Sequence, residues 1–217
     1  MTTPSPSPSA RGRPKDDELR QRRHDEILEV AVELFAARGY AGADTQLVAD
    51  RLGVGKGTIY RYFPSKEALF LAAVDLGMRR LRESVDAVAE AEPDPLRRIA
   101  AATRAYLTFF EQHPELVELL MQERAQFKDR KKSTYFVHRD QGICKLKAVL
   151  AELIGQGLVR EVSVDRLADV FSQLLYGTMF THYFTGREKP LAQQTEDLLD
   201  VFFHGILTAQ GLQTYYG

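Results

Sequence analysis

The chain has 217 residues, of which 44% are hydrophobic, and its formal net charge is −1 at pH 7. This length and composition predict packed cores in one domain, or in one small and one medium domain. No run approaches the ~18 to 20 apolar residues of a membrane-spanning helix, and the first residues lack an apolar signal segment, so we expect a cytoplasmic protein. The single cysteine, Cys144, excludes an internal disulfide, and we expect it to fill the core.

Residues 1–19 differ in composition from the rest of the chain. The stretch 2–9, TTPSPSPS, holds no apolar side chain. Such a segment cannot bury enough surface to offset the entropy of ordering, so we interpret residues 1–19 as a disordered tail. Arg11 and Arg13 lie within RGRP, which resembles the core of an AT-hook, an extended basic segment that binds the minor groove. The alternative is a solubilising tail with a non-specific attraction to phosphate.

The next segment is predicted to form three helices joined by short turns. In the first helix, apolar residues recur at helical spacing, at Ile27, Val30, Ala31, Leu34 and Phe35. Gly39 can end this helix, and Asp44 and Thr45 are both suitable N-caps for a two-turn second helix that stops at Gly53. Residues 55–63 are predicted to form a third short helix, because the following proline disfavours helical geometry at the residue before it.

Two short helices around a glycine-containing turn, here ADRLGVGKGT, are typical of a helix-turn-helix, whose second helix lies in the major groove of DNA. The third helix offers an ammonium, a hydroxyl, two phenols and a guanidinium, groups that hydrogen-bond phosphates and base edges. They belong to Lys56, Thr58, Tyr60, Arg61 and Tyr62. For the two tyrosines, the alternative interpretation is aromatic packing in the core.

The remainder is predicted to be helical. Ser65 can cap a long fourth helix, and further helices are expected at roughly 95–112, 114–128, 133–155, 164–185 and 195–210. The segment GLVREVSV is too short and isolated to support a sheet. No His, Asp or Glu cluster has metal-ligand spacing, so we expect neither a metal nor another cofactor. We also find no nucleophile with a paired base, which argues against an enzyme.

Residues 27–70, ILEVAVELFAARGYAGADTQLVADRLGVGKGTIYRYFPSKEALF, resemble the DNA-binding domain of TetR/AcrR regulators. The resemblance joins ARGY, LGV, KGTIY and FPSKEAL in one ungapped stretch. It implies phosphate contacts by Thr45, Thr58, Tyr60 and Lys66, and we assign base contacts to Lys56, Gly57 and Arg61. Two residues depart from the pattern: Gly55 replaces a frequent serine cap, and Tyr62 replaces a frequent histidine.

The same resemblance implies an all-α protein with three parts: a tail (1–19), a three-helix helix-turn-helix domain (20–66) and a larger helical domain for ligand binding and dimerisation (67–217). Pairing of the last two helices would form a C2 homodimer. An apolar or aromatic small molecule is the expected effector. Candidate pocket residues, for each of which core packing is the alternative, are Tyr106, Phe110, Met121, Tyr135, His138, Tyr176, Met179 and Tyr183.

The sequence therefore predicts a ligand-responsive transcriptional regulator with double-stranded operator DNA as its partner, most simply a repressor that a small molecule releases. The alternative is a DNA-binding architectural protein without an effector, and the AT-hook-like segment favours it. No membrane partner is expected.

Overall fold

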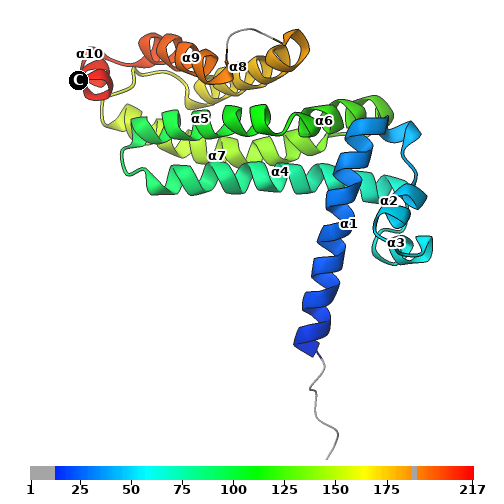
Figure 1. Cartoon of the computed structure of the whole chain (residues 1–217). Helices are drawn as coiled ribbons and strands as arrows, with labels where there is room; N and C mark the ends of the chain where they lie inside the picture. Colours follow the sequence, from blue (N-terminus) through cyan, green and yellow to red (C-terminus); the bar gives the residue numbers. More distant parts are fainter. Residues whose placement is uncertain (1–12, 187–189) are drawn as a thin grey trace, which may run out of the picture. The chain divides into compact units, whose positions relative to one another are not determined.

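Figure 1 shows the computed structural model of the chain, which describes residues 13–186 and 190–217, with side chains from residue 17 onward. The described residues form ten helices and two compact units, divided between Ala73 and Val74. The first unit holds α1 (Arg13–Gly42), α2 (Thr45–Arg51), α3 (Lys56–Tyr62) and the beginning of α4 (Lys66–Ala91). The second holds the rest of α4 with α5 (Pro95–Gln112), α6 (Pro114–Gln126), α7 (Thr134–Gly155), α8 (Val164–Thr185), α9 (Leu191–Ile206) and α10 (Ala209–Tyr216).

The core of the first unit is built from the apolar faces of its four helices. Phe35 of α1 packs edge-on against Phe70 of α4, with ring centroids 5.0 Å apart, and both side chains are fully buried. Ile59 is the buried anchor of α3, and Val48 that of α2. Short helices like α2 and α3 are marginal alone, so this burial is what holds them in place.

The first helix starts earlier than its apolar pattern. α1 begins at Arg13, and thus includes residues that we interpreted as part of the tail. At Gly39 the backbone leaves helical geometry (φ 71°, ψ 164°), at the position where the sequence predicted a break.

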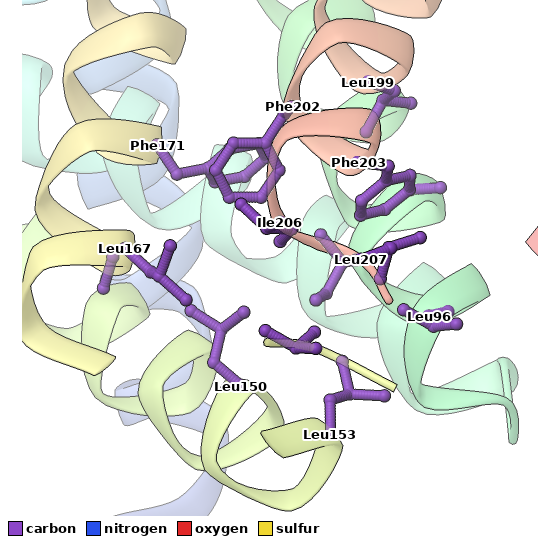
Figure 2. Close-up of a cluster of buried hydrophobic side chains, with 14 of the residues drawn as sticks. Leu96, Leu150, Leu153, Leu167, Phe171, Leu199, Phe202, Phe203, Ile206 and Leu207 are labelled. Carbon is purple, nitrogen blue, oxygen red and sulfur yellow. The ribbon is translucent and has the colours of Figure 1, made fainter. Parts of the chain in front are cut away.

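The second unit has a larger apolar core, shown in Figure 2. Side chains of α7, α8 and α9 meet there with Leu96 of α5. Phe171 and Phe202 lie with ring centroids 4.4 Å apart, and Phe203 is completely buried. Such close-packed contacts are sensitive to the loss of even one large side chain.

The expected last helix, 195–210, is in fact two helices. α9 ends at Ile206, Leu207 is extended, and the Thr208 hydroxyl caps α10 by accepting from the Gly211 amide at 3.1 Å. Gly211 approaches the backbone so closely that an added Cβ would lie 2.1 Å from the carbonyl oxygen of Leu158. A side chain there would force α10 away, so glycine is required at this junction.

The all-α architecture is confirmed, as is the order of a helix-turn-helix domain followed by a larger helical domain. The segment GLVREVSV forms no strand, and its only ladder contact within the described chain is an isolated bridge between Val159 and Leu207. Cys144 is exposed on α7, so the expectation that it fills the core was wrong. Ile143 and Leu150, on other faces of α7, are the buried residues instead. None of the helices in the described part is long and apolar enough to span a membrane.

Candidate nucleic-acid interface and ligand cavity

The turn between α2 and α3 places the two helices at a sharp angle through a left-handed residue. Gly53 has φ 64°, a conformation that glycine adopts without the steric cost of a side chain. The Val54 amide donates to the Ala49 carbonyl at 2.9 Å, which closes the turn back onto α2. The helix-turn-helix predicted from the sequence is therefore formed.

The face that α3 presents follows from which of its residues are buried. Ile59 is fully buried, and each helical residue turns by about 100°. Gly57 and Arg61 therefore lie opposite Ile59, at the centre of the exposed face. Lys56 and Tyr60 lie on one flank of this face, and the other flank is formed by Thr58 and Tyr62. An added Cβ at Gly57 would meet no atom within 4 Å, so this centre is open.

The first flank of α3 is tied to the N-terminus of α2. Asp44 caps α2 by accepting from the Gln46 amide at 2.9 Å, and Lys56 Nζ lies 3.2 Å from the same carboxylate. The Gln46 hydrogen bond, followed by that of Lys56, lowers the pKa of Asp44 below its usual value of 3.8. Lys56, which we assigned to a base contact, is thus held near the surface by an exposed carboxylate.

Thr45 differs in its environment from the other predicted DNA contacts. It is only 3% exposed, and its hydroxyl lies 3.1 Å from Asp44 Oδ1 and 3.3 Å from Tyr60 OH. In this arrangement Thr45 positions the phenol of Tyr60, whose side chain is 44% exposed, rather than offering its own hydroxyl to solvent.

Lys66, at the first turn of α4, lies against the end of α1. Its ammonium donates to the Ala41 carbonyl at 3.3 Å and lies 4.7 Å from the centroid of the Tyr40 ring. A cation over an aromatic face is favourable, so these contacts orient the lysine without neutralising its charge. Of the two tail arginines, Arg11 lies outside the described residues, and Arg13 begins α1 with its side chain also outside them.

The second unit contains a cavity of about 410 Å³ that is lined by residues of α4, α5, α7 and α8. Its volume lies within the range of roughly 300 to 1,000 Å³ that is usual for small-molecule sites. Most of the exposed surface of its wall is apolar, and apolar residues that line it are Met78, Leu81, Val85, Ala89, Ile99, Ala102, Ile143, Leu146, Val149, Phe171 and Leu175. The wall thus favours an apolar ligand.

Three of the predicted pocket residues line this cavity: Tyr106, Tyr135 and His138. The hydroxyls of Tyr106 and Tyr135 are 2.9 Å apart. Burial raises the pKa of Tyr106 well above its usual value and that of Tyr135 to about 12, so both phenols stay protonated. Two hydroxyls hold two protons and share one hydrogen bond, so one O–H remains. If Tyr106 donates the shared bond, the remaining O–H belongs to Tyr135; if Tyr135 donates it, the Tyr106 O–H has Met179 Sδ as a weak acceptor at 4.0 Å.

His138 is fixed by a carboxylate at the cavity wall. Its Nε2 lies 2.8 Å from Asp75 Oδ1, while Arg79 Nε lies 3.0 Å from the other oxygen of Asp75. Because a carboxylate only accepts, Nε2 donates its proton to Asp75. Nδ1 is buried and has no hydrogen-bond partner among the described residues.

The other five predicted pocket residues lie outside the cavity wall, and three of them contact the wall tyrosines from behind. Phe110 packs on Tyr106, Tyr176 packs on Tyr135, and Met179 Sδ lies 4.0 Å from the Tyr106 hydroxyl. Tyr183 donates to Glu118 at 2.9 Å, and Met121 lies on α6, which does not contribute to the wall.

The sequence prediction missed the charged residues at the cavity. Arg82 contacts Gln141, and Lys145 Nζ lies 2.7 Å from Asp86. Both pairs join α4 to α7 beside the apolar wall. The sequence did contain a pattern that indicates the contribution of α4 to the cavity wall. The spacing of its residues places five of them on one helical stripe: Met78, Leu81, Arg82, Val85 and Ala89. Within the described chain, no group of three or more His, Cys, Asp or Glu side chains could hold a metal ion.

A helix-turn-helix with an exposed polar helix, followed by a helical unit with an apolar cavity, defines the class of one-component DNA-binding regulators. Residues 27–73 match the model of the family "Bacterial regulatory proteins, tetR family". The chain is 31% identical to the HTH-type transcriptional activator FasR of Mycolicibacterium smegmatis over 159 residues, which cover 67% of this chain and 71% of FasR. The chain therefore belongs to the tetR family of bacterial transcriptional regulators.

Other similar proteins differ in their named roles. The nucleoid occlusion factor SlmA of Aliivibrio fischeri is 29% identical over 110 residues, half of this chain and 56% of SlmA. The regulator FadR of Bacillus subtilis, solved in complex with stearoyl-CoA, has the same fold. Its TM-score is 0.70 at 20% identity, and the match covers 84% of this chain and 99% of FadR.

Proposed function

We propose that this protein is a cytoplasmic homodimeric regulator that binds operator DNA through α3 and changes its DNA affinity when an apolar small molecule enters the cavity. One observation carries the proposal: α3 buries only Ile59 while exposing Gly57 and Arg61, in a chain that also holds a largely apolar cavity. An α-helix fits the major groove of B-form DNA, where a guanidinium hydrogen-bonds guanine through two donors.

Exposed apolar residues on α8 and α9 support dimerisation. Val201 of α9 is 73% exposed, and Val170 and Leu174 of α8 are also exposed. Large apolar side chains gathered on two successive helices are typical of a subunit interface. A symmetric dimer would present two copies of α3, and specific binding requires them about 34 to 36 Å apart.

Coupling between the ligand and DNA would run through α4. Its first residues belong to the unit that contains α3, and its later residues Met78, Leu81 and Val85 line the cavity. A ligand shifts an equilibrium only by its difference in affinity for two states, so the effector would bind the DNA-free dimer more tightly. Repression is the simplest sign of control, although FasR is named an activator.

The cavity favours an effector with an apolar body and one oxygen acceptor. Its apolar wall would cover the body, and the spare O–H of the Tyr106 and Tyr135 pair would donate to a carbonyl, ether or hydroxyl oxygen. The stearoyl-CoA bound by FadR has a long aliphatic chain, and that chemistry is one class to include among the candidates.

The direct test is selection of bound fragments from the genomic DNA of the source organism, followed by footprinting of the purified dimer on the selected duplexes. A short protected site with two half-sites about one helical turn apart is expected. Apolar compounds with and without a carbonyl group are then titrated against the complex. Loss of binding only with compounds that also stabilise the free protein is the expected response.

The architectural alternative is supported by the similarity to SlmA, a nucleoid occlusion factor. It predicts protection along any duplex with no discrete footprint and no response to any cavity ligand. Either result in the footprinting and titration experiments would favour it over the regulator.

A further inference from the structure

A basic groove follows the flank of α3 that faces away from α2. It lies between the N-terminal half of α1 and the recognition helix, and its lining residues are Leu19, Arg20, Arg23, Val54, Thr58, Arg61 and Tyr62. Three of the seven are arginines, and none is acidic. A concave surface with one sign of charge concentrates counter-ions of the other sign.

The early start of α1 creates this groove. The ring of His24 packs against Phe63 at the end of α3, with centroids 4.9 Å apart, and Leu28 is fully buried. These contacts hold the N-terminal half of α1 beside α3. Arg20 lies one turn before His24, and residues four apart share a helix face, so Arg20 is presented on the α3 side.

Two of the three arginines have no acidic partner. Arg23 Nη1 lies 2.8 Å from Glu26 Oε2 and is partly neutralised. Arg20 forms no ion pair or hydrogen bond with any described residue, and Arg61 contacts only the Tyr62 ring, at 5.8 Å from its centroid. Both side chains are exposed. The groove therefore carries guanidinium groups that are free to bind an anion, and guanidinium matches phosphate geometry well.

The position of the groove relative to α3 points to the identity of that anion. A helix in the major groove has a phosphate backbone on each side. On one flank, Lys56 and Tyr60 lie beside α2, as their contacts with Asp44 and Thr45 show. On the other flank, Thr58 and Tyr62 lie beside Arg20 and Arg23.

We propose that Arg20, supported by Arg23, binds a backbone phosphate of the strand opposite the one approached by the α2 flank. The proposal rests on DNA binding through α3 and adds a second row of phosphate contacts to it. α1 thereby acts as part of the DNA-binding surface, in addition to its role in the core.

The test is the salt dependence of operator affinity, measured on the full chain with a duplex from the selection experiment. Each protein–phosphate contact contributes about 0.9 to the slope of log K against log salt. Arg20→Ala should therefore lower the slope by about 0.9 per subunit bound. Over a fourfold rise in salt, from ~50 to ~200 mM, the advantage of the unmodified protein should shrink by about 3.5-fold for each subunit's contact.

Arg22→Ala is the matched control. It removes the same charge from the same helix, but Arg22 lies about 200° around the helix from Arg20, is exposed, and does not line the groove. Its slope should equal that of the unmodified protein. Arg20→Lys should keep the slope, because it keeps the charge, and circular dichroism should show equal helix content for all variants.

Equal slopes for Arg20→Ala and Arg22→Ala would overturn the proposal. A lower affinity for Arg20→Ala with an unchanged slope would overturn it as well, because this would indicate a packing effect. These outcomes leave the proposed function intact, whereas an unmodified protein that binds no selected duplex would refute the proposed function itself.

Discussion

The helix α3 and the ligand cavity differ in how their residues are distributed along the sequence. α3 is seven residues long, and the groups that it offers to DNA all come from one continuous segment. The cavity draws its wall from four helices, and its lining residues span positions 78 to 175. Substitutions in α3 should therefore change binding with little effect on folding, whereas substitutions around the cavity act on packing as well. Four experiments test this difference.

The largest effect is expected in the core behind the cavity. Phe203 is fully buried and lies 4.6 Å from the Tyr215 ring, between centroids. Phe203→Ala removes this packing and leaves a void, so it should lower the free energy of unfolding by about 3 to 5 kcal/mol. Urea denaturation measures the loss. The neighbouring Val201→Ala, at an exposed site, should change the stability of the monomer by less than about 0.5 kcal/mol.

The cavity itself can be filled from α7. Gly142 lines the cavity, and an added Cβ there would meet no atom within 4 Å. Gly142→Leu should occupy ligand space and weaken binding of the aromatic, anionic probe 1-anilinonaphthalene-8-sulfonate by about 1 to 3 kcal/mol, the range that extra methylenes cost when they are forced into filled space. Fluorescence titration measures it. Ala148→Leu, exposed on the same helix outside the cavity, is the control, and equal losses in both would show that the probe binds elsewhere.

In the first unit, the contrast is between a base contact from α3 and a phosphate contact from the start of α4. Arg61→Ala should reduce discrimination among operator sequences by about 1 to 3 kcal/mol at one position, because a guanidinium at the centre of the face reads base edges. Lys66→Ala should weaken binding similarly on all sequences. Competition assays with single-base operator variants compare the two, and identical profiles would contradict this division of roles.

The smallest effect is expected at the N-cap of α2. Asp44→Ala should destabilise the first unit by about 1 kcal/mol, whereas Asp44→Asn should be nearly neutral because asparagine also caps well. The lowered pKa of Asp44 sets the sign of the pH dependence. Its contribution is present above the unfolded value near 3.8 and is lost as the pH falls through the lower folded value. A stability difference between Asp44→Ala and the unmodified protein that persists at pH 2 would contradict this.

The sequence predicted the fold more fully than the cavity, for physical reasons. Gly53, Ile59 and the residue before Pro64 act locally, so their spacing was sufficient to place α2, the turn and α3. Glycine conformation and helix capping depend on few neighbours. Tertiary contacts were less predictable: Thr45 is buried under Tyr60, an environment that no local pattern reveals.

The cavity shows the limit most clearly. Tyr106 and Met179 were equally plausible from the sequence, because both lie on apolar helix faces. Only the packing of the four helices determines which side chains line the cavity and which pack behind its wall. The same applies to Arg20, which we placed at the start of the helix-turn-helix domain without a role, and which α1 brings beside α3.

The exposed thiol of Cys144 gives the molecule a built-in attachment point for a spectroscopic reporter. It is the one cysteine in the sequence, so a nitroxide label would mark each subunit once without any substitution. In a symmetric dimer, pulsed electron paramagnetic resonance would then yield a single distance between the two labels, one on each α7 helix. A change in that distance on adding an effector would report the motion of the cavity wall directly, in solution and in the presence or absence of DNA.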